Sequence, residues 1–216
     1  MSRMPRTLTF RLTVLIAVST ALAILSASHP ALQSVSAERR AGMPSADAPS
    51  ASPPSSPPKR LTLDEAIREL DLIRPPRPKL ADDFTIPTAD GKSFRLSAQR
   101  GRTVFVNFWA TWCPPCLEEM PALERLWRAQ QAAGFVLLAV TVDTNPKLAT
   151  PFVERHGLTF RVGFDPKMEL ANTYGVRALP SSFVIDRDGR LTAVAIGPRV
   201  WDNVAAHALI ERLTAR

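Results

Sequence analysis

The fold of this chain is decided by one stretch, Thr103-Val-Phe-Val-Asn-Phe-Trp-Ala-Thr-Trp-Cys-Pro-Pro-Cys116. Its first seven residues are rich in β-branched and aromatic side chains, which favours a strand. The segment from Pro114 to about Ala133 then repeats apolar side chains at helical spacing: Met120, Leu123, Leu126 and Trp127. The two cysteines of the chain, Cys113 and Cys116, are therefore predicted to lie where a strand gives way to a helix.

Strand and helix patterns alternate along the rest of the C-terminal part. Phe84–Ile86 and Ser93–Leu96 flank the turn pair Asp90-Gly91, which predicts an N-terminal β-hairpin. Further strands are expected at Phe135–Val142, Ser182–Ile185 and Leu191–Ala195, and further helices at Leu148–His156, Met168–Tyr174 and Asp202–Thr214. Strand–helix–strand order implies parallel pairing with right-handed crossovers, and Asp188-Gly189 predicts a late hairpin. The predicted fold class is α/β, with a mixed central sheet flanked by helices.

Two cysteines in a C-x-x-C pair can form a structural cross-link, half of a zinc site or a redox couple. As a cross-link, Cys113 and Cys116 would close a very short loop, which gains little from loop-closure entropy. A structural zinc site usually has four ligands, and His29, His156 and His207 show no ligand spacing to the pair. The expected place between a strand and a helix favours the redox interpretation, with no metal.

Three groups of motifs match the pattern of a known family. They are Phe108-Trp-Ala-Thr-Trp-Cys-Pro-Pro-Cys116; Asp83-Phe-Thr85 with Asp90-Gly-Lys92; and Tyr174-Gly-Val-Arg-Ala-Leu-Pro180 with Ser182-Phe-Val-Ile-Asp186 and Asp188-Gly189. In these residues, and over about Ala81 to the C-terminus, the chain resembles the TlpA/ResA-like group of exported thiol–disulfide oxidoreductases. The resemblance implies a thioredoxin-like three-layer fold with an N-terminal β-hairpin extension. It also implies an enzyme that needs no cofactor beyond a redox-active disulfide, Cys113–Cys116.

The two cysteines are expected to have different roles in disulfide exchange. Cys113 is predicted at a helix N-terminus, where partial positive charge and unpaired amides stabilise a thiolate, so it is the expected exposed attacker. Cys116, one turn further along, would be less exposed and would resolve the mixed disulfide. Pro114 and Pro115 have no N–H to donate to the Cys113 sulfur, which leaves the Cys116 amide as the expected donor and predicts a more reducing couple. The alternative is that proline only suits a helix start.

Resolution requires Cys116 to lose a proton, and a nearby base would help. Thioredoxin has an aspartate six residues before its first cysteine, but this chain has Asn107 there, and Asn cannot take the proton. The resemblance implies Glu119 instead, which lies three residues after Cys116 and so on the same helical side. The alternative is that Glu118 and Glu119 are solvated acids favoured early in a helix.

Leu179-Pro180 is the remaining predicted element of the site. An X–Pro bond is cis only about 5% of the time in folded proteins, but the resemblance implies a cis bond here, with the proline facing the cysteines. The Leu179 backbone would then pair with an extended substrate segment. The expected substrate-binding residues are Trp112, Pro114, Leu179 and Pro180. Trp109 and Phe108 are also expected around the site, although packing in the core suits Phe108 better.

The N-terminal segments have the composition of a targeting signal followed by a spacer. Arg3, Arg6 and Arg11 precede the apolar run from Leu12 to Ala27, which is the layout of a secretory signal. Stretched to Leu32, the run approaches the ~20 residues of a spanning helix. Residues 1–37 are therefore expected to be either a cleaved signal peptide or a retained membrane anchor, and both alternatives stay open. Residues 38–60, rich in Ala, Pro and Ser, are expected to be a disordered spacer.

A short helix is expected between the spacer and the main domain. Thr62-Leu-Asp-Glu65 has the spacing of a capping box, and Pro75-Pro76 would stop the helix. Residues 61–78 are thus a short helix with a Pro-rich connector, and residues 79–216 form the thioredoxin-like domain.

Composition and charge exclude several classes of protein. The 216 residues are 45% hydrophobic and 22% charged, which excludes a wholly disordered, a collagen-like or a polytopic membrane protein. Most of the net charge of +7 lies in residues 1–60, which hold seven basic and two acidic residues. The remainder carries 20 basic against 18 acidic residues, too even a balance for a phosphate-binding face. Nucleic acid is excluded as the main partner.

The resemblance also implies a location and partners. It suggests the periplasm of a Gram-negative bacterium, with the protein either soluble or anchored to the inner membrane by its N-terminal segment. The expected partners are protein thiols and disulfides, such as apocytochrome c C-x-x-C-H segments or copper-site thiols of cytochrome oxidase. A membrane-embedded thiol reductant would regenerate the enzyme.

Other functions compete with the reductase interpretation. A periplasmic disulfide oxidase or isomerase would use the same chemistry, but no large helical insertion or dimerisation domain is visible. A Cu(I)-binding chaperone would use Cys113 and Cys116 as soft ligands. The intact C-x-x-C disfavours a noncatalytic interaction module, and Ala110, where peroxiredoxins use Thr or Ser, disfavours a peroxidase.

Overall fold

A computed structural model describes residues 60–215, so the expected signal or anchor and all of the expected spacer except Arg60 lie outside the described residues. The strands are β1 (Lys79–Leu80), β2 (Thr85–Pro87), β3 (Ser93–Arg95), β4 (Thr103–Trp109), β5 (Phe135–Thr141), β6 (Arg161–Phe164), β7 (Ser181–Ile185) and β8 (Arg190–Ile196). The helices are α1 (Leu63–Glu69), α2 (Pro114–Gln130), α3 (Ala149–Arg155), α4 (Glu169–Thr173) and α5 (Val204–Thr214). Within this part, no helix is long and apolar enough to cross a bilayer.

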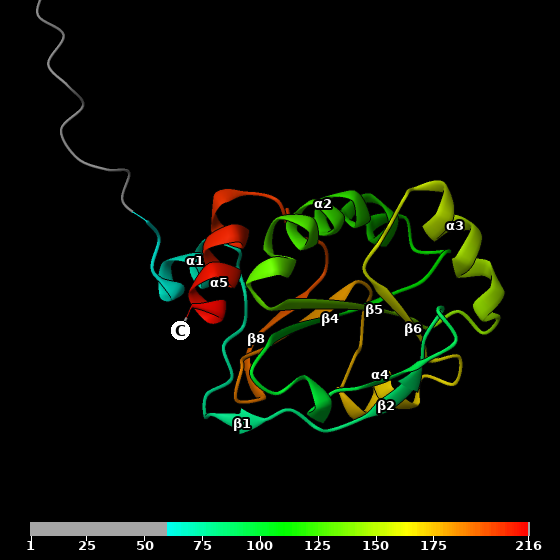
Figure 1. Ribbon diagram of the computed structural model, residues 1–216, viewed down its shortest axis with the longest axis horizontal. Coiled ribbons are helices and arrows are strands. Elements are labelled where there is room, and N and C mark those ends of the chain that lie inside the picture. Colours follow the sequence, from blue (N-terminus) through cyan, green and yellow to red (C-terminus); the bar gives the residue numbers. More distant parts are fainter. Residues whose placement is uncertain (1–59, 216) are drawn as a thin grey trace, which may run out of the picture. The chain divides into compact units, whose positions relative to one another are not determined.

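The main sheet has the strand order β1-β8-β7-β4-β5-β6, and β4 lies inside it. β4 pairs in parallel with β5 and antiparallel with β7, and all seven of its residues are buried. Figure 1 shows α2, α3 and α5 on one side of this mixed sheet, with α4 and the β2–β3 hairpin on the other. The predicted three-layer thioredoxin-like architecture is confirmed.

Helix α2 begins shortly after the end of β4, so the cysteine pair lies beyond the C-terminal end of this central strand. Cys113 is the N-cap residue and Pro114 and Pro115 open the helix, where a missing N–H costs nothing. The face of α2 that carries Cys116, Met120 and Leu123 is fully buried. This packing fixes the first turn of the helix, and with it the disulfide, against the domain.

Helix α1 packs on the domain and shares its core. The predicted capping box is present, because Thr62 Oγ1 accepts from the Glu65 amide and the Glu65 carboxylate accepts from the Thr62 amide. Ala66, Ile67 and Leu70 are buried in the same hydrophobic cluster as the sheet. The chain after α1 then runs along β8, where Ile73 and Val194 exchange backbone hydrogen bonds of 2.8 Å.

Two strands were not predicted from the sequence, and each has a physical reason. β1 is a two-residue strand, and both of its residues are exposed. β6 contains Gly163, which weakens a strand pattern. A Cβ at Gly163 would lie 2.4 Å from Ile86 Cδ1, the end of a hairpin side chain, so the glycine leaves room for this side chain against β6. The hairpin therefore packs directly on the backbone of β6, and the predicted pairing of β2 with β3 is confirmed.

Candidate active site

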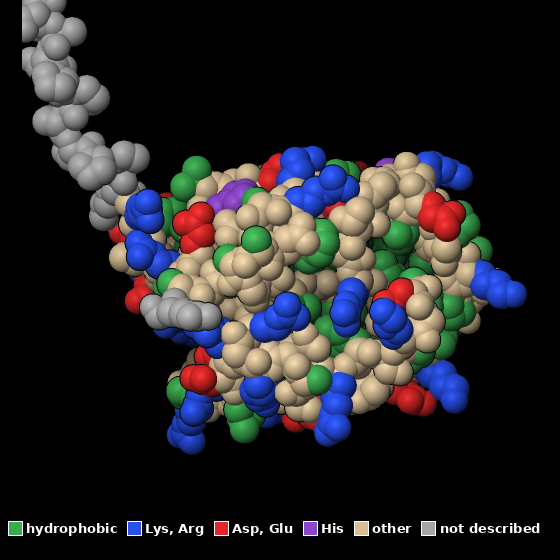
Figure 2. All heavy atoms as spheres, in the orientation of Figure 1, with side chains coloured by type: hydrophobic (Ala, Val, Ile, Leu, Met, Phe, Trp, Pro, Cys, Tyr) green, Lys and Arg blue, Asp and Glu red, His purple; other side chains and the backbone are tan. Residues whose placement is uncertain are grey.

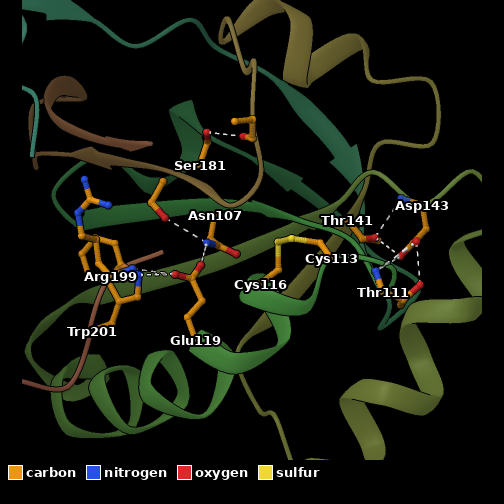
Figure 3. Close-up of a disulfide and its surroundings, with 12 residues drawn as sticks. Asn107, Thr111, Cys113, Cys116, Glu119, Thr141, Asp143, Ser181, Arg199 and Trp201 are labelled. Carbon is orange, nitrogen blue, oxygen red and sulfur yellow. Dashed lines mark hydrogen bonds between the residues drawn. A yellow bond between two sulfur atoms is a disulfide. The ribbon is translucent and has the colours of Figure 1, made fainter. Parts of the chain in front are cut away.

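Cys113 and Cys116 form a disulfide at the N-terminus of α2 (Figure 3), with an S–S distance of 2.07 Å. Cys113 is 5% exposed and Cys116 is fully buried, so the order of exposure is the predicted one. The high exposure expected for Cys113 is wrong for this disulfide form. The ring closed by the disulfide packs the Cys113 side chain against the domain, and only a small part of it reaches solvent.

The amides of the first turn of α2 are all withheld from the Cys113 sulfur. Pro114 and Pro115 have none, and the amides of Cys116 and Leu117 donate to the Cys113 carbonyl oxygen at 3.0 and 3.2 Å. The expected donation from the Cys116 amide to the sulfur is therefore absent in the disulfide form. The Cys116 N–H is used instead in the backbone hydrogen bond to the Cys113 carbonyl oxygen that begins the helix.

The loop that leads from β4 to Cys113 is held by a buried carboxylate, Asp143, which follows β5. Asp143 accepts from the Thr111 amide at 3.1 Å, from Thr111 Oγ1 at 2.9 Å and from Thr141 Oγ1 at 2.6 Å. Figure 3 shows this cluster beside the disulfide. Sequence reasoning missed it, because the partners lie 32 residues apart and Thr and Asp are common loop residues.

Glu119 lies on α2 three residues after Cys116 and is buried, with only 4% of the residue exposed to solvent. Its Oε1 accepts from Asn107 Nδ2 at 2.7 Å, and its Oε2 accepts from Trp201 Nε1 at 3.1 Å and from the Arg199 amide at 3.3 Å. Burial disfavours the charged form and raises the pKa of Glu119 to about 7, against the opposing effect of these donors. The alternative of a solvated Glu119 is wrong, whereas Glu118 is exposed.

Asn107 occupies the β4 position at which thioredoxin has an aspartate, and its role here is to donate. Its Nδ2 also donates to Ser182 Oγ at 3.1 Å, so β4 and β7 both support the carboxyl group of Glu119. Its Oδ1 is buried and has no partner within the described part of the chain. A group with a pKa near 7, one helical turn from Cys116, is suited to exchange a proton near neutral pH.

Solvent reaches this buried acid through a pocket of about 420 Å³ between α2 and the β8–α5 loop, residues 197–203. Glu118, Glu119 and Arg125 line it from α2, and residues 198–200 and Asp202 line it from the loop. Arg125 and Asp202 pair across the pocket at 2.6 Å. These loop residues were not predicted from the sequence, since Arg199 and Trp201 lie 80 residues and more from Glu119.

The Leu179–Pro180 bond is cis, as the resemblance implied. Leu179 is half-buried, and neither its N–H nor its carbonyl oxygen makes a backbone hydrogen bond to another described residue. Trp112, directly before Cys113, is 67% exposed. The expectation for Trp109 is wrong: its side chain points into the core and packs on Phe152, with ring centroids 5.5 Å apart. Phe108 is buried as well.

Residues 60–215 contain no group of three or more His, Cys, Asp and Glu side chains placed to hold a metal ion.

A thioredoxin fold with a disulfide at the start of the first long helix defines a thiol–disulfide exchange protein. The chain belongs to the AhpC/TSA family, whose pattern matches residues 79–194. It is 40% identical over 128 residues to the thiol-disulfide oxidoreductase ResA of Geobacillus thermodenitrificans, covering 59% of this chain and 73% of that one. It is 35% identical over 129 residues to the ResA of Bacillus anthracis, covering 60% and 75%.

Solved structures agree with these relatives. A putative thiol:disulfide interchange protein DsbE from Chlorobium tepidum is 35% identical, with a TM-score of 0.55, and the match covers 58% of this chain and 89% of that one. StoA from Bacillus subtilis is 26% identical, with a TM-score of 0.51 over 57% and 94% of the two chains. The protein is a thiol–disulfide oxidoreductase that acts on protein thiols and disulfides.

Proposed function

We propose that the enzyme reduces protein disulfides outside the cytoplasm, with Cys113 as the attacking and Cys116 as the resolving cysteine. The observation that carries the direction is the start of α2, where no amide of the first turn is free to donate to the Cys113 sulfur. A thiolate without such donors is less stable, so the reduced form is less favoured and the couple is more reducing.

In the proposed cycle, the two cysteines supply the electrons for the substrate disulfide, and Glu119 accepts the proton of Cys116. The Cys113 thiolate attacks one sulfur of a substrate disulfide, and the other substrate sulfur leaves as a thiolate. Cys116 then gives its proton to the Glu119 carboxylate, and its thiolate attacks the Cys113 sulfur. The second substrate thiolate leaves and takes up a proton, and the enzyme ends with the Cys113–Cys116 disulfide that the structure shows. A thiol reductant in the membrane would return it to the reduced form.

Substrates would bind as extended segments beside the cis proline. The unpaired N–H and carbonyl groups of Leu179 are suited to add a substrate backbone as a short strand. Trp112 offers a large exposed ring for an apolar substrate side chain next to the attacking sulfur. The C-x-x-C-H segments of apocytochrome c and the copper-site thiols of cytochrome oxidase are the proposed substrate classes.

We place the enzyme in the periplasm because the sequence of residues 1–37 has the layout of a secretory signal or anchor. If the segment is retained, residues 38–60 would connect the membrane to the catalytic domain and raise the effective concentration of membrane-bound substrates.

The direction of the reaction is tested by the reduction potential of the full chain, measured by equilibration with dithiothreitol and glutathione. A reductase requires a potential well below that of the glutathione pool, and the protein should reduce insulin. A potential near that of the strong oxidant DsbA, about −120 mV, would assign the chain to the oxidases instead. A Cu(I) titration of the reduced protein, with the oxidised protein as control, tests the chaperone alternative.

Replacing Pro114 with His should make the couple more oxidising. The change restores an N–H at the first helical position and adds a partial positive charge, so the Cys113 thiolate becomes more stable and its pKa falls. The reduction potential should become less negative by about 30 mV for each about 1.4 kcal/mol of stabilisation. Pro114→Ala is the matched control, because it restores the N–H without charge and should give a smaller shift of the same sign. A more negative potential in both variants would contradict the argument.

A further inference from the structure

Arg199 joins the end of helix α1 to the active-site region. Its Nε donates to the Leu70 carbonyl oxygen at 2.7 Å, and its Nη2 donates to the Asp71 carbonyl oxygen at 2.8 Å and to Asp71 Oδ2 at 3.1 Å. Asp71 has a φ of 49°, a left-handed conformation that costs energy in a residue other than glycine. Arg199 thus satisfies two carbonyl groups at the point where the chain turns out of α1.

The guanidinium also organises its own loop. Nη1 donates to the carbonyl oxygens of Ile196, Gly197 and Pro198 at 3.3, 3.3 and 2.9 Å. The Arg199 side chain is only 19% exposed, so these contacts lie largely out of water, where they are stronger than on a surface. The first half of the β8–α5 loop is therefore folded around the Arg199 guanidinium, which also binds the two carbonyl groups at the end of α1.

The same loop supplies two of the three donors to Glu119. The Arg199 amide and Trp201 Nε1 both donate to Glu119 Oε2, and Figure 3 shows both residues on the side of this carboxyl group away from Cys116, with the Arg199 guanidinium turned away from it. The third donor, Asn107, belongs to the rigid centre of the sheet. A displacement of the loop would remove the donors to Oε2 and leave the Asn107 contact in place.

We propose that Arg199 is a positioning residue, which holds the β8–α5 loop against α1 and thereby keeps two hydrogen-bond donors on Glu119. Helix α1 lies outside the segment that carries the disulfide, but through Arg199 it then helps to set the hydrogen bonds of Glu119 in the active site. The effect on the reaction rate rests on the proposed role of Glu119 in proton transfer, but the effect on Glu119 itself does not.

The charges around Glu119 make this proposal testable by titration. Asn107 and Ser182 face it from β4 and β7 as neutral groups, and Trp201 faces it from the loop. Arg125 on α2 is paired with Asp202 at the rim of the pocket. The Arg199 guanidinium attracts the carboxylate and acts, with the three donors, against the rise in pKa caused by burial. Glu118, the neighbouring acid on α2, is exposed.

The test is the pKa of Glu119 in the full chain, oxidised so that the thiols do not titrate. The signal is read from carboxyl carbons by NMR in glutamate labelled with ¹³C, and Glu119→Gln identifies it. In Arg199→Gln the pKa should rise by about one unit above the wild-type value, because a cation and two donors are lost or displaced. Arg125→Gln is the matched control, since it removes a nearby exposed arginine of the same pocket and should leave the pKa unchanged. An unchanged pKa in Arg199→Gln, or an equal shift in Arg125→Gln, overturns the proposal.

A second variant separates positioning from simple charge. Arg199→Lys keeps the positive charge but loses the fork that binds several carbonyl groups at once. Hydrogen exchange at the α1 amides should be faster by about tenfold or more in both Arg199 variants, while exchange in β5 should not change. The Glu119 pKa in Arg199→Lys should lie between those of the wild type and Arg199→Gln. A wild-type pKa together with fast α1 exchange would show that only charge matters, and would overturn the positioning role.

The outcome is also separable from the proposed function. If Glu119→Gln leaves the rate and pH profile of disulfide exchange unchanged, Glu119 is not the proton acceptor, and the proposed cycle fails at that step. The shift of the Glu119 pKa in Arg199→Gln would still report the link between α1 and the acid.

Discussion

Replacing Cys113 with serine should abolish disulfide exchange, while Cys116→Ser should leave the attack intact and trap the enzyme on its substrates. Serine at position 113 has no thiolate to attack with, whereas serine at position 116 cannot resolve the mixed disulfide. Insulin reduction should fall to background in both variants. Only Cys116→Ser should accumulate covalent adducts in cells, seen as bands that dithiothreitol removes and mass spectrometry identifies.

The roles of the two cysteines follow from their different depth in the fold, so they can be checked independently of any substrate. Reduced wild-type protein treated with limiting iodoacetamide should be alkylated first at Cys113, which retains some exposure, and only later at the fully buried Cys116. Faster alkylation of Cys116 would reverse the assignment. The adducts trapped by Cys116→Ser would also name the physiological substrates.

The stability of the oxidised protein should fall as the pH rises from about 4.5 to about 7, and Glu119→Gln should remove most of this fall. Burial raises the pKa of Glu119 from 4.5 to about 7, so in this range the folded state binds more protons than the unfolded state. The stabilisation is complete below pH 4.5 and is lost as the pH passes through 7. At about 1.4 kcal/mol per pKa unit, the loss amounts to up to about 3 kcal/mol.

Urea unfolding at a series of pH values between 5 and 8 measures this effect. Asp83, Asp90 and Glu124 have lowered pKa values, so the stability they contribute is lost only as the pH falls toward those values, outside this window. Glu118→Gln is the matched control, because it removes an exposed carboxylate from the same turn of α2 and should retain the wild-type pH dependence. Equal pH dependence in the wild type and in Glu119→Gln would show that the carboxyl group does not titrate in this range.

Local patterns predicted the elements of the fold well, because each is decided by residues close together in the sequence. The apolar run of β4, the prolines at the start of α2 and the capping box of α1 all lie within a few residues of their effect. The patterns failed at β6, where Gly163 weakens the strand pattern and leaves room for a hairpin side chain, Ile86, from another part of the chain. Trp109 was misplaced for a related reason, since it is buried among residues distant in the sequence, such as Phe152 of α3.

Sequence motifs predicted the cysteine pair, the place of Glu119 on the same helix and the cis bond at Leu179–Pro180, but not the surroundings of Glu119. The cysteine pair and Glu119 lie within seven residues of one another, but the groups that set the environment of Glu119 come from β4, β7 and the β8–α5 loop. The Arg199 guanidinium binds backbone carbonyl groups. Every residue has such a group, so these contacts cannot be recognised from residue types in the sequence. Such contacts follow from the three-dimensional fold alone.

The packing of the hairpin on β6 has a consequence for an enzyme that acts on the thiols of other protein chains. An open sheet edge would pair with any extended chain and would invite aggregation. Here Thr88 of the hairpin bridges to Gly163, and the Ala89 amide donates to the Val162 carbonyl oxygen at 2.9 Å, so the β6 edge is occupied. At the opposite edge, Ile73 and the short β1 cover β8, and the chain between them carries Pro75, Pro76 and Pro78, which have no N–H to offer. Because both sheet edges carry these neighbours, the backbone of Leu179, which makes no backbone hydrogen bond to another described residue, is the place left for the strand pairing with substrate that we propose.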